Sequence, residues 1–352
     1  MKRVGNLWPY VTTEKNIISA YKKSVTSKGH RPAIKKFNEH LADNLKAIQD
    51  LLLYGEFHTG KYTVRDIFEP KHRKIYILPF APDRIVQHAV MNVVEPYWTT
   101  LMYAHSYSCI PKRGIHVGAQ KTMEFVRRNK YCLKCDVSKF YPSIRHDVAY
   151  EMIERKIKDQ KVLDIFYDVI NSIDGETNVP IGNYMSQWIG NLYLTEMDNI
   201  IKQKLKVKDY IRYCDDFILF SKDSTFLMDC QEYIADYLNT RLGMRLSKCA
   251  LFNLKQGVDF LGYRFFPDGY ILLRKTTAKR MKKRCAHLFH LIHHRLIDAD
   301  AARSSVASML GWMKWANSNN FKVALDIYKL YDEVIAYAEE KQIREAAKAS
   351  QI

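Results

Sequence analysis

The sequence contains no long apolar segment. Nowhere do about 18 consecutive apolar residues occur, which is the length at which a helix can span a bilayer. The first residues, MKRVGNLWPYVTTEKN, also lack the apolar core of a signal peptide. We therefore expect a cytoplasmic protein with no membrane partner.

Cysteine is scarce, and its pattern argues against a framework of disulfide bonds. The seven cysteines are odd in number and scattered, mostly within apolar runs, as reduced core cysteines are. Cys132 and Cys135 have the spacing of half a zinc site, but no second pair follows them. We predict that both lie in the core. Internal repeats are missing as well, and low complexity is limited to a short tail near 339–350.

Negative charge is in short supply. The 352 residues include 55 Lys and Arg against 38 Asp and Glu, which gives a net charge of +17. Such an excess favours a polyanionic partner through counterion release and electrostatic steering. Nucleic acid is the leading candidate, and a basic but otherwise ordinary protein is the alternative. With 47% hydrophobic residues, the chain can form a large core divided into two or three lobes.

Hydrophobic periodicity predicts an α+β chain. Helical spacing is found at 12–54, from Asp83 onward, from His146, at 162–173, at 180–194 and at 223–242. Strand-like runs lie at 62–80, at 130–137 and on both sides of residues 215–216. After Arg274 the composition changes to basic helices with few glycines, so we expect a boundary between lobes there.

Two of the expected strands present acids at their ends. Asp215 and Asp216 stand between apolar runs that predict a β-hairpin with the acids at its turn. The pair could simply supply turn chemistry. The flanking runs are apolar enough to be central strands, however, so the carboxylates would lie at the rim of a core, where uncompensated charge is unfavourable. Asp136 ends the other strand, at 131–137, in the same setting.

Bound cations would compensate these carboxylates. Nucleotidyl transfer uses two Mg²⁺ ions about 3.5 to 4 Å apart, one at the primer 3′-hydroxyl and one at the triphosphate. Oxygen ligands on neighbouring strands can build such a site. We therefore expect Asp136, Asp215 and Asp216 to hold two Mg²⁺ ions.

An ordered series of motifs resembles the reverse transcriptases. Tyr213-Cys214-Asp215-Asp216 resembles their Tyr-X-Asp-Asp motif, and other matches extend over roughly Asn6 to Tyr263. These other segments are Asp136 with Phe140 and Tyr141, 180–194, 246–248, 257–263, 84–89 and 108–114. The resemblance implies a right-hand polymerase. Fingers with N-terminal helices would occupy 1–115, and a basic helical thumb 271–352. The palm, an antiparallel sheet with helices on one face, would occupy 116–270, with finger helices inserted at about 145–180.

The resemblance also implies roles for single residues. Asp136 and Asp215 would be direct metal ligands, with the Val137 carbonyl and Asp216 beside them. Tyr141 would be the sugar gate, whose ring clashes with a ribonucleotide 2′-hydroxyl. Arg73, with Lys71 or Lys74, would grip the triphosphate. Lys248 would protonate the leaving pyrophosphate or be an ordinary exposed lysine. Further nucleotide contacts would come from Ser138, Ile181, Gly182 and Gln187.

The segment 181–187 resembles one particular group of reverse transcriptases. Its aliphatic residue followed by Gly, and its closing Ser-Gln, resemble the enzymes of diversity-generating retroelements. That family copies a template-repeat RNA into cDNA with misincorporation opposite adenine, and the cDNA replaces a variable region of a target gene. The implied partners are the template-repeat RNA, the primer or cDNA strand, dNTPs and a small basic accessory variability protein. Ile181 removes an amide that could monitor the nascent pair, and Gly182 permits close backbone approach.

Alternatives remain open. From Arg274 only about 80 residues follow, fewer than the usual domain size of about 100 to 150, so a further nuclease domain is not expected. His287, His290 and His294 share one face of the thumb and could bind metal or lie near template-primer backbone. The chain could also be another bacterial reverse transcriptase, defence-associated or intron-like and free-standing. A non-catalytic RNA-binding scaffold is the third hypothesis, against which the intact carboxylates argue.

Overall fold

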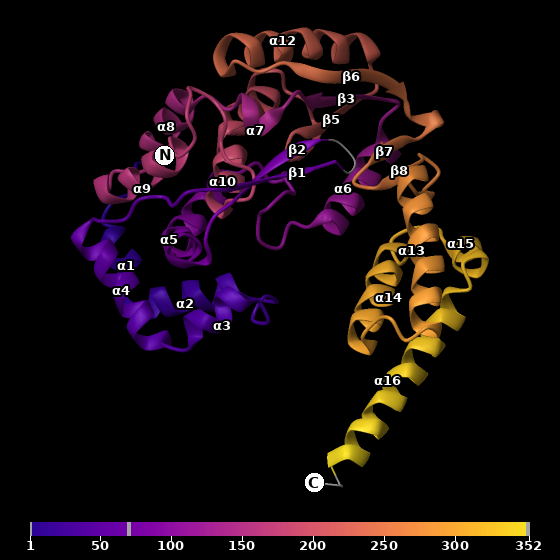
Figure 1. Cartoon of the computed structure of the whole chain (residues 1–352). Coiled ribbons are helices and arrows are strands. Elements are labelled where there is room, and N and C mark those ends of the chain that lie inside the picture. The colour runs from indigo at the N-terminus through magenta and orange to yellow at the C-terminus, as the bar shows by residue number, and fades with distance from the viewer. Residues whose placement is uncertain (1, 69–71, 350–352) are drawn as a thin grey trace. The chain divides into compact units, whose positions relative to one another are not determined.

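Helices dominate the chain, and antiparallel sheets accompany them, which confirms the α+β prediction. A computed structural model describes residues 2–68 and 72–349 (Figure 1). The chain divides into two compact units. The first comprises residues 1–114, 133–219 and 224–251, and the second comprises 115–132, 220–223 and 252–352. The finger, palm and thumb boundaries given above stay a prediction.

The first unit begins with four helices, the first two of which are packed on a longer helix at 85–101. They are α1 (Trp8–Val11), α2 (Glu14–Val25), α3 (Pro32–Asn38) and α4 (Leu41–Tyr54). The Thr13 hydroxyl caps α2 by accepting from the Asn16 amide. The Asn16 side chain in turn donates to the Ala89 carbonyl of α5 (Ile85–Leu101) at 2.9 Å. The expected helices at 12–54 are thus present.

A β-hairpin leads into α5. Strands β1 (Thr63–Ile67) and β2 (Arg73–Ile77) pair antiparallel, with Thr63 opposite Ile77 and Ile67 opposite Arg73. A kinked turn, η1 (Phe80–Arg84), in which Ala81 has an extended backbone, precedes α5. The strand-like run at 62–80 and the helix expected from Asp83 are both confirmed.

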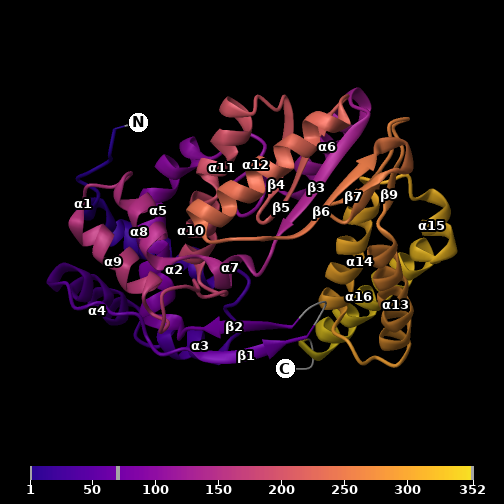
Figure 2. The ribbon, with the colours of Figure 1, turned by 90° about the horizontal axis from the view of Figure 1, so that it is seen from above.

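A four-stranded sheet with the order β4-β5-β3-β6 carries the acid-bearing strands. Its strands are β3 (Tyr131–Val137), β4 (Asp209–Tyr213), β5 (Asp216–Ser221) and β6 (Leu246–Asn253). Both β4 and β5 are almost wholly buried, as expected for central strands. Helix α12 (Ser224–Leu242) covers one face of the sheet in both views (Figures 1 and 2). It ends at Gly243, which has a φ of 65°.

Helices also fill the chain between β3 and β4. They are α7 (Phe140–Ser143), α8 (His146–Glu154), α9 (Gln160–Ile170), α10 (Tyr184–Tyr193), α11 (Thr195–Asn199) and the π-helical turn η2 (Ile200–Lys204). The helix predicted at 162–173 lies at Gln160–Ile170. The helix predicted at 180–194 begins only at Tyr184, because Gly182 has a φ of 122°, outside the helical region.

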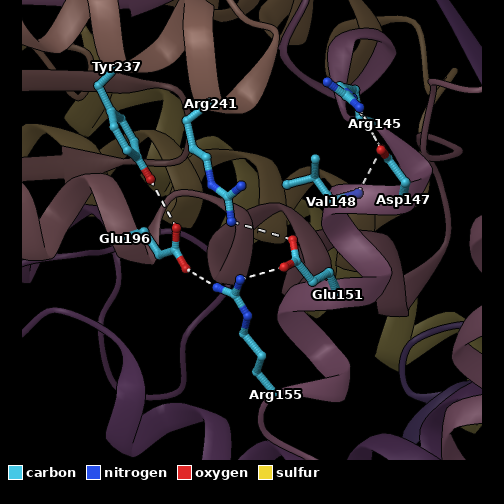
Figure 3. A network of polar contacts seen from close by, with 8 residues as sticks. All are labelled: Arg145, Asp147, Val148, Glu151, Arg155, Glu196, Tyr237 and Arg241. Atoms are coloured by element: carbon cyan, nitrogen blue, oxygen red, sulfur yellow. Dashed lines mark hydrogen bonds and ion pairs between the residues drawn. The ribbon is translucent and has the colours of Figure 1, made fainter.

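A surface network of ion pairs joins α8, α11 and α12 (Figure 3). Arg155 pairs with Glu151 and, at 3.1 Å, with Glu196. Arg241 of α12 pairs with Glu151 at 3.4 Å, and the Tyr237 hydroxyl donates to Glu196 at 3.0 Å. These pairs hold the helices that follow β3 beside the helix that covers the sheet.

The second unit contains helices and a small sheet. The sheet has the order β7-β8-β9 and follows the 3₁₀ turn η3. The elements are α6 (Ile115–Arg128), η3 (Leu254–Gln256), β7 (Val258–Phe260), β8 (Tyr263–Phe265), β9 (Ile271–Leu273), α13 (Lys275–His293), α14 (Ala299–Met313), α15 (Asn319–Ala324) and α16 (Ile327–Ala349). Helix α13 begins directly after Arg274, where the composition changes. In the described ranges, no helix has the length and apolarity needed to cross a membrane.

Helix α13 has one buried and one basic face. Met281, Cys285, Leu288 and Ile292 are buried in a core shared with α14 and α16. The basic residues between 275 and 284 are exposed, and so are His287, His290 and His294. The rings of His290 and His294 lie 4.4 Å apart. Within residues 2–68 and 72–349 no three metal-ligating side chains come together as a ligand group.

Candidate active site

The two adjacent acids occupy the tip of the predicted hairpin. Cys214 and Asp215 form the turn between β4 and β5, and Asp216 is the first residue of β5. Cys214 has a φ of 57°, in the left-handed region that non-glycine residues rarely adopt. The hairpin is therefore confirmed, with one acid in the turn and the other at the start of the strand.

Asp136 lies beside this turn. The amide of the next residue, Val137, donates to the Asp215 carbonyl at 3.2 Å. On the other side of β3, the Ser247 hydroxyl donates to the Asp136 carbonyl at 3.1 Å, and the Ser138 amide donates to the Arg245 carbonyl at 2.7 Å. The structure thus brings Asp136 and Asp215 together at one end of neighbouring strands.

Negative charge accumulates at this end of the sheet. Burial raises the pKa of Asp215, and the charge of Asp136 raises it further. Burial also raises the pKa of Asp216 to about 6, although Lys134 opposes this from 3.3 Å. In the described part of the chain, Asp216 Oδ1 is buried and accepts no hydrogen bond. A cation placed here would relieve both the repulsion and the unsatisfied oxygen.

These residues fit magnesium, although they do not form a complete cage. In the described ranges no three Asp, Glu, His or Cys side chains are close enough to hold an ion by themselves. Mg²⁺ is usually bound by one or two carboxylates together with substrate phosphates and water. The half-buried, mutually repelling carboxylates and the unpartnered oxygen of Asp216 match this mode of binding. Val137 follows Asp136 at the end of β3, so its carbonyl oxygen belongs to the same end of the strand.

Tyr141 stands beside the turn. Its hydroxyl oxygen lies 3.8 Å from Cys214 Sγ, and its ring centre lies 5.1 Å from that of Phe140. Gly190 of α10 makes this position possible, because a Cβ there would lie 3.0 Å from the Phe140 ring and 3.2 Å from the Tyr141 ring. Burial raises the pKa of Tyr141 far above its ordinary value, so the side chain stays a neutral phenol.

The segment before α10 is fastened to the hairpin β1–β2. The Tyr76 amide donates to the Ile181 carbonyl at 2.8 Å, and the Asn183 side chain donates to the Tyr62 hydroxyl at 2.7 Å. A Cβ on Gly182 would lie only 2.4 Å from the Tyr76 carbonyl oxygen. In this structure the close approach expected of Gly182 is made to the backbone of β2.

The other predicted nucleotide contacts are spread over neighbouring elements. Arg73 and Lys74 are exposed on β2, and the positive charge of Arg73 partly offsets the rise that burial causes in the pKa of Asp215. Lys71 lies outside the described residues. Gln187 is exposed on α10, and Lys248 is exposed on β6. Ser138 is half-buried after β3.

Two basic residues near the acids have no role in the sequence predictions. Lys134 pairs with Asp216, as described above. Arg212 is fully buried on β4 and pairs with the buried Asp198 of α11 at 2.6 Å. The sequence signal was a charged residue inside an apolar strand, since such a residue requires a buried partner.

Comparison with known proteins identifies the family. Residues 69–265, more than half of the chain, match the family described as reverse transcriptase (RNA-dependent DNA polymerase), and the chain belongs to this family. The prediction of an RNA-directed DNA polymerase is thereby confirmed.

Relatives and solved structures extend the comparison. Protein YkfC of Escherichia coli K12 is 23% identical over 318 residues, which cover 74% of this chain and 83% of that protein. The retron Ec73 reverse transcriptase of Escherichia coli is 25% identical over 238 residues, which cover 63% of this chain and 73% of that protein. The structure of a telomerase from Candida albicans has a TM-score of 0.48 and 12% identity, covering 82% of this chain and 61% of that chain.

Proposed function

We propose that the chain copies RNA into DNA at the carboxylates of Asp136, Asp215 and Asp216. The observation that carries this proposal is the hydrogen bond from the Val137 amide to the Asp215 carbonyl, which joins the two acid-bearing strands at one end. Two bound Mg²⁺ ions would activate the primer 3′-hydroxyl there and neutralise charge on the triphosphate. Asp136, Asp215 and the Val137 carbonyl would hold the ions, with Asp216 beside them.

The surrounding side chains act on the nucleotide. Arg73 and Lys74 on β2 bind the triphosphate, with the guanidinium suited to paired contacts with phosphate oxygens. The Tyr141 ring excludes a 2′-hydroxyl. Lys248 donates a proton to the leaving pyrophosphate. Ser138 and Gln187 contribute further contacts to the nucleotide.

Primer extension on a defined RNA template tests the polymerase. The substitution Asp215→Asn removes a ligand charge and should abolish Mg²⁺-dependent incorporation of dNTPs. The matched control is Asp229→Asn on the exposed face of α12, which should extend like the wild type. Equal extension by the two variants, or an inactive wild type, would contradict the proposal.

We further propose that the enzyme is the error-prone polymerase of a diversity-generating retroelement, active in the cytoplasm. It would copy a template-repeat RNA for mutagenic retrohoming, assisted by a small basic accessory variability protein. The segment Ile181 to Gln187 supports this subtype, and the attachment of Ile181 and Asn183 to β1–β2 puts that segment next to the proposed triphosphate grip. Another bacterial reverse transcriptase is the second candidate, because the retron enzyme is among the relatives.

Sequencing the cDNA distinguishes these candidates. With a defined RNA, errors should concentrate opposite template adenines, and the accessory protein should change the yield or the spectrum. Ile181→Gln restores an amide and should reduce adenine-directed errors, while Ile181→Leu should keep them. A uniform error spectrum in the wild type, or the same spectrum in Ile181→Gln, would favour another bacterial reverse transcriptase. Absence of any extension would favour a non-catalytic RNA-binding scaffold.

A further inference from the structure

A buried cluster of polar side chains lies behind the catalytic turn. Arg212 and Asp198 are both fully enclosed, and the guanidinium meets the carboxylate with two bonds, from Nε to Oδ1 at 2.8 Å and from Nη2 to Oδ2 at 2.6 Å. The Tyr210 hydroxyl donates to the same Oδ1 at 2.7 Å. This fork-to-fork geometry fixes the plane of the guanidinium.

The remaining guanidinium nitrogen points toward the turn. Arg212 Nη1 donates to the Cys214 carbonyl at 3.1 Å and to Asn191 Oδ1 of α10 at 3.2 Å. Cys214 is the residue with a φ of 57°, and Asp215 follows it directly. The Asp215 carbonyl accepts from the Val137 amide at 3.2 Å. Two consecutive carbonyls of the turn therefore accept hydrogen bonds, that of Cys214 from Arg212 and that of Asp215 from β3.

Stability alone is a poor explanation for this cluster. A buried ion pair contributes little net stability, and apolar side chains of similar volume often replace such pairs without loss. Apolar side chains could not donate to the Cys214 carbonyl, however. That bond matters because an L residue in the left-handed region adopts an unfavourable backbone conformation that its surroundings must maintain.

We propose that Arg212 is a positioning residue for nucleotidyl transfer. Its guanidinium, oriented by Asp198, holds the Cys214 carbonyl and thereby fixes the direction in which the Asp215 carboxylate points. Asp198 and Tyr210 serve this role by orienting Arg212, and none of the three touches the nucleotide. The inference rests on the proposed function of Asp215 and assigns a task to a residue outside the carboxylate set.

The test removes the cluster without leaving an unpaired buried charge. The triple variant Asp198→Leu, Tyr210→Phe and Arg212→Met replaces it with apolar groups, and thermal unfolding should show a folded protein. The rate of a single dNTP incorporation at saturating Mg²⁺ should fall roughly 100-fold, as expected for a misplaced catalytic group. The KM for dNTP and the affinity for template-primer should stay close to wild-type values. Mn²⁺ binding, followed by electron paramagnetic resonance of the free ion, should weaken by roughly 10-fold.

Arg212→Lys is the second variant and covers the case in which the triple variant does not fold. It keeps the positive charge opposite Asp198, but an ammonium lacks the planar fork that serves Asp198 and the Cys214 carbonyl together. It should show the same loss of rate with an unchanged KM. A wild-type rate in either folded variant overturns the inference while the proposed function stands. If wild-type protein is as inactive as Asp215→Asn, the proposed function fails first.

Discussion

The Tyr76 amide donates a hydrogen bond to the Ile181 carbonyl at 2.8 Å, across more than one hundred residues of sequence. This bond fastens the segment before α10 to the edge of β2. In the proposed function β2 carries the triphosphate grip, and Ile181 lies where the nascent pair is monitored. Triphosphate binding and monitoring of the nascent pair therefore both depend on this backbone contact between β2 and the segment before α10. Any side chain added at Gly182 would push the segment away from β2.

Gly182→Ala tests this dependence. The new Cβ would lie 2.4 Å from the Tyr76 carbonyl oxygen, and alanine would have to adopt a φ of 122°. We expect a lower melting temperature and a higher KM for dNTP. Gly29→Ala is the control, because a Cβ at that position has no neighbour within 4 Å. If the two variants behave alike, the segment tolerates displacement and the coupling is absent.

Tyr141→Ala tests the sugar gate. Removing the ring beside the turn would open space for a 2′-hydroxyl, and the preference for dNTP over rNTP should fall by roughly 10- to 200-fold, the range that one steric contact can supply. The measurement is the ratio of kcat/KM for dCTP and CTP on one template-primer. Tyr141→Phe keeps the ring and should keep the ratio. An unaltered ratio in Tyr141→Ala would assign discrimination to another residue.

His88 gives the fold a dependence on pH. Its ring is stacked on Tyr184 at 4.3 Å, and burial lowers its pKa from the ordinary value of 6.5 to about 4, with help from the charge of Lys23. Between these values the unfolded chain binds a proton here and the folded chain does not, so the free energy of unfolding decreases as pH falls from 6.5 to 4. Above that window His88 contributes no pH dependence.

His88→Phe isolates this effect, because the ring stack on Tyr184 is kept and the proton site is lost. Melting temperatures are measured from pH 7.5 down to pH 5 for both proteins. We expect the wild type to lose more on acidification than the variant, with the other titrating groups common to both. Parallel curves would show that His88 is protonated equally well in the folded and unfolded chains.

The sequence predicted most of what depends on local pattern. The apolar runs around Asp215 and before Asp136 predicted the hairpin and the strand, because a short apolar run bounded by turn residues can be recognised from neighbouring residues alone. The helix boundary at Tyr184 was missed, since Pro180 and Ile181 continue an apolar pattern. The backbone conformation of Gly182 is determined by contact with a distant strand.

Tertiary pairing determined the rest of the site. In the sheet, β5 lies beside β3, and this neighbourhood brings Asp215 close to Asp136. The order of strands in a sheet cannot be deduced from the spacing of residues along the chain. The partnership of Arg212 with Asp198 joins a strand to a helix in the same way. A charged residue in an apolar strand indicates that a buried partner exists, but the sequence does not identify that partner.

The ion pair between Lys134 and Asp216 has a consequence for the proposed metal site. This lysine, on the same strand as Asp136, lies 3.3 Å from Asp216. Structural zinc sites supply folding energy, and their domains unfold when the metal is removed. At the proposed magnesium site the Lys134 ammonium partly balances the negative charge of the acids, so we expect the fold to form without the ion. A chelator should therefore silence the enzyme reversibly and leave its melting curve intact.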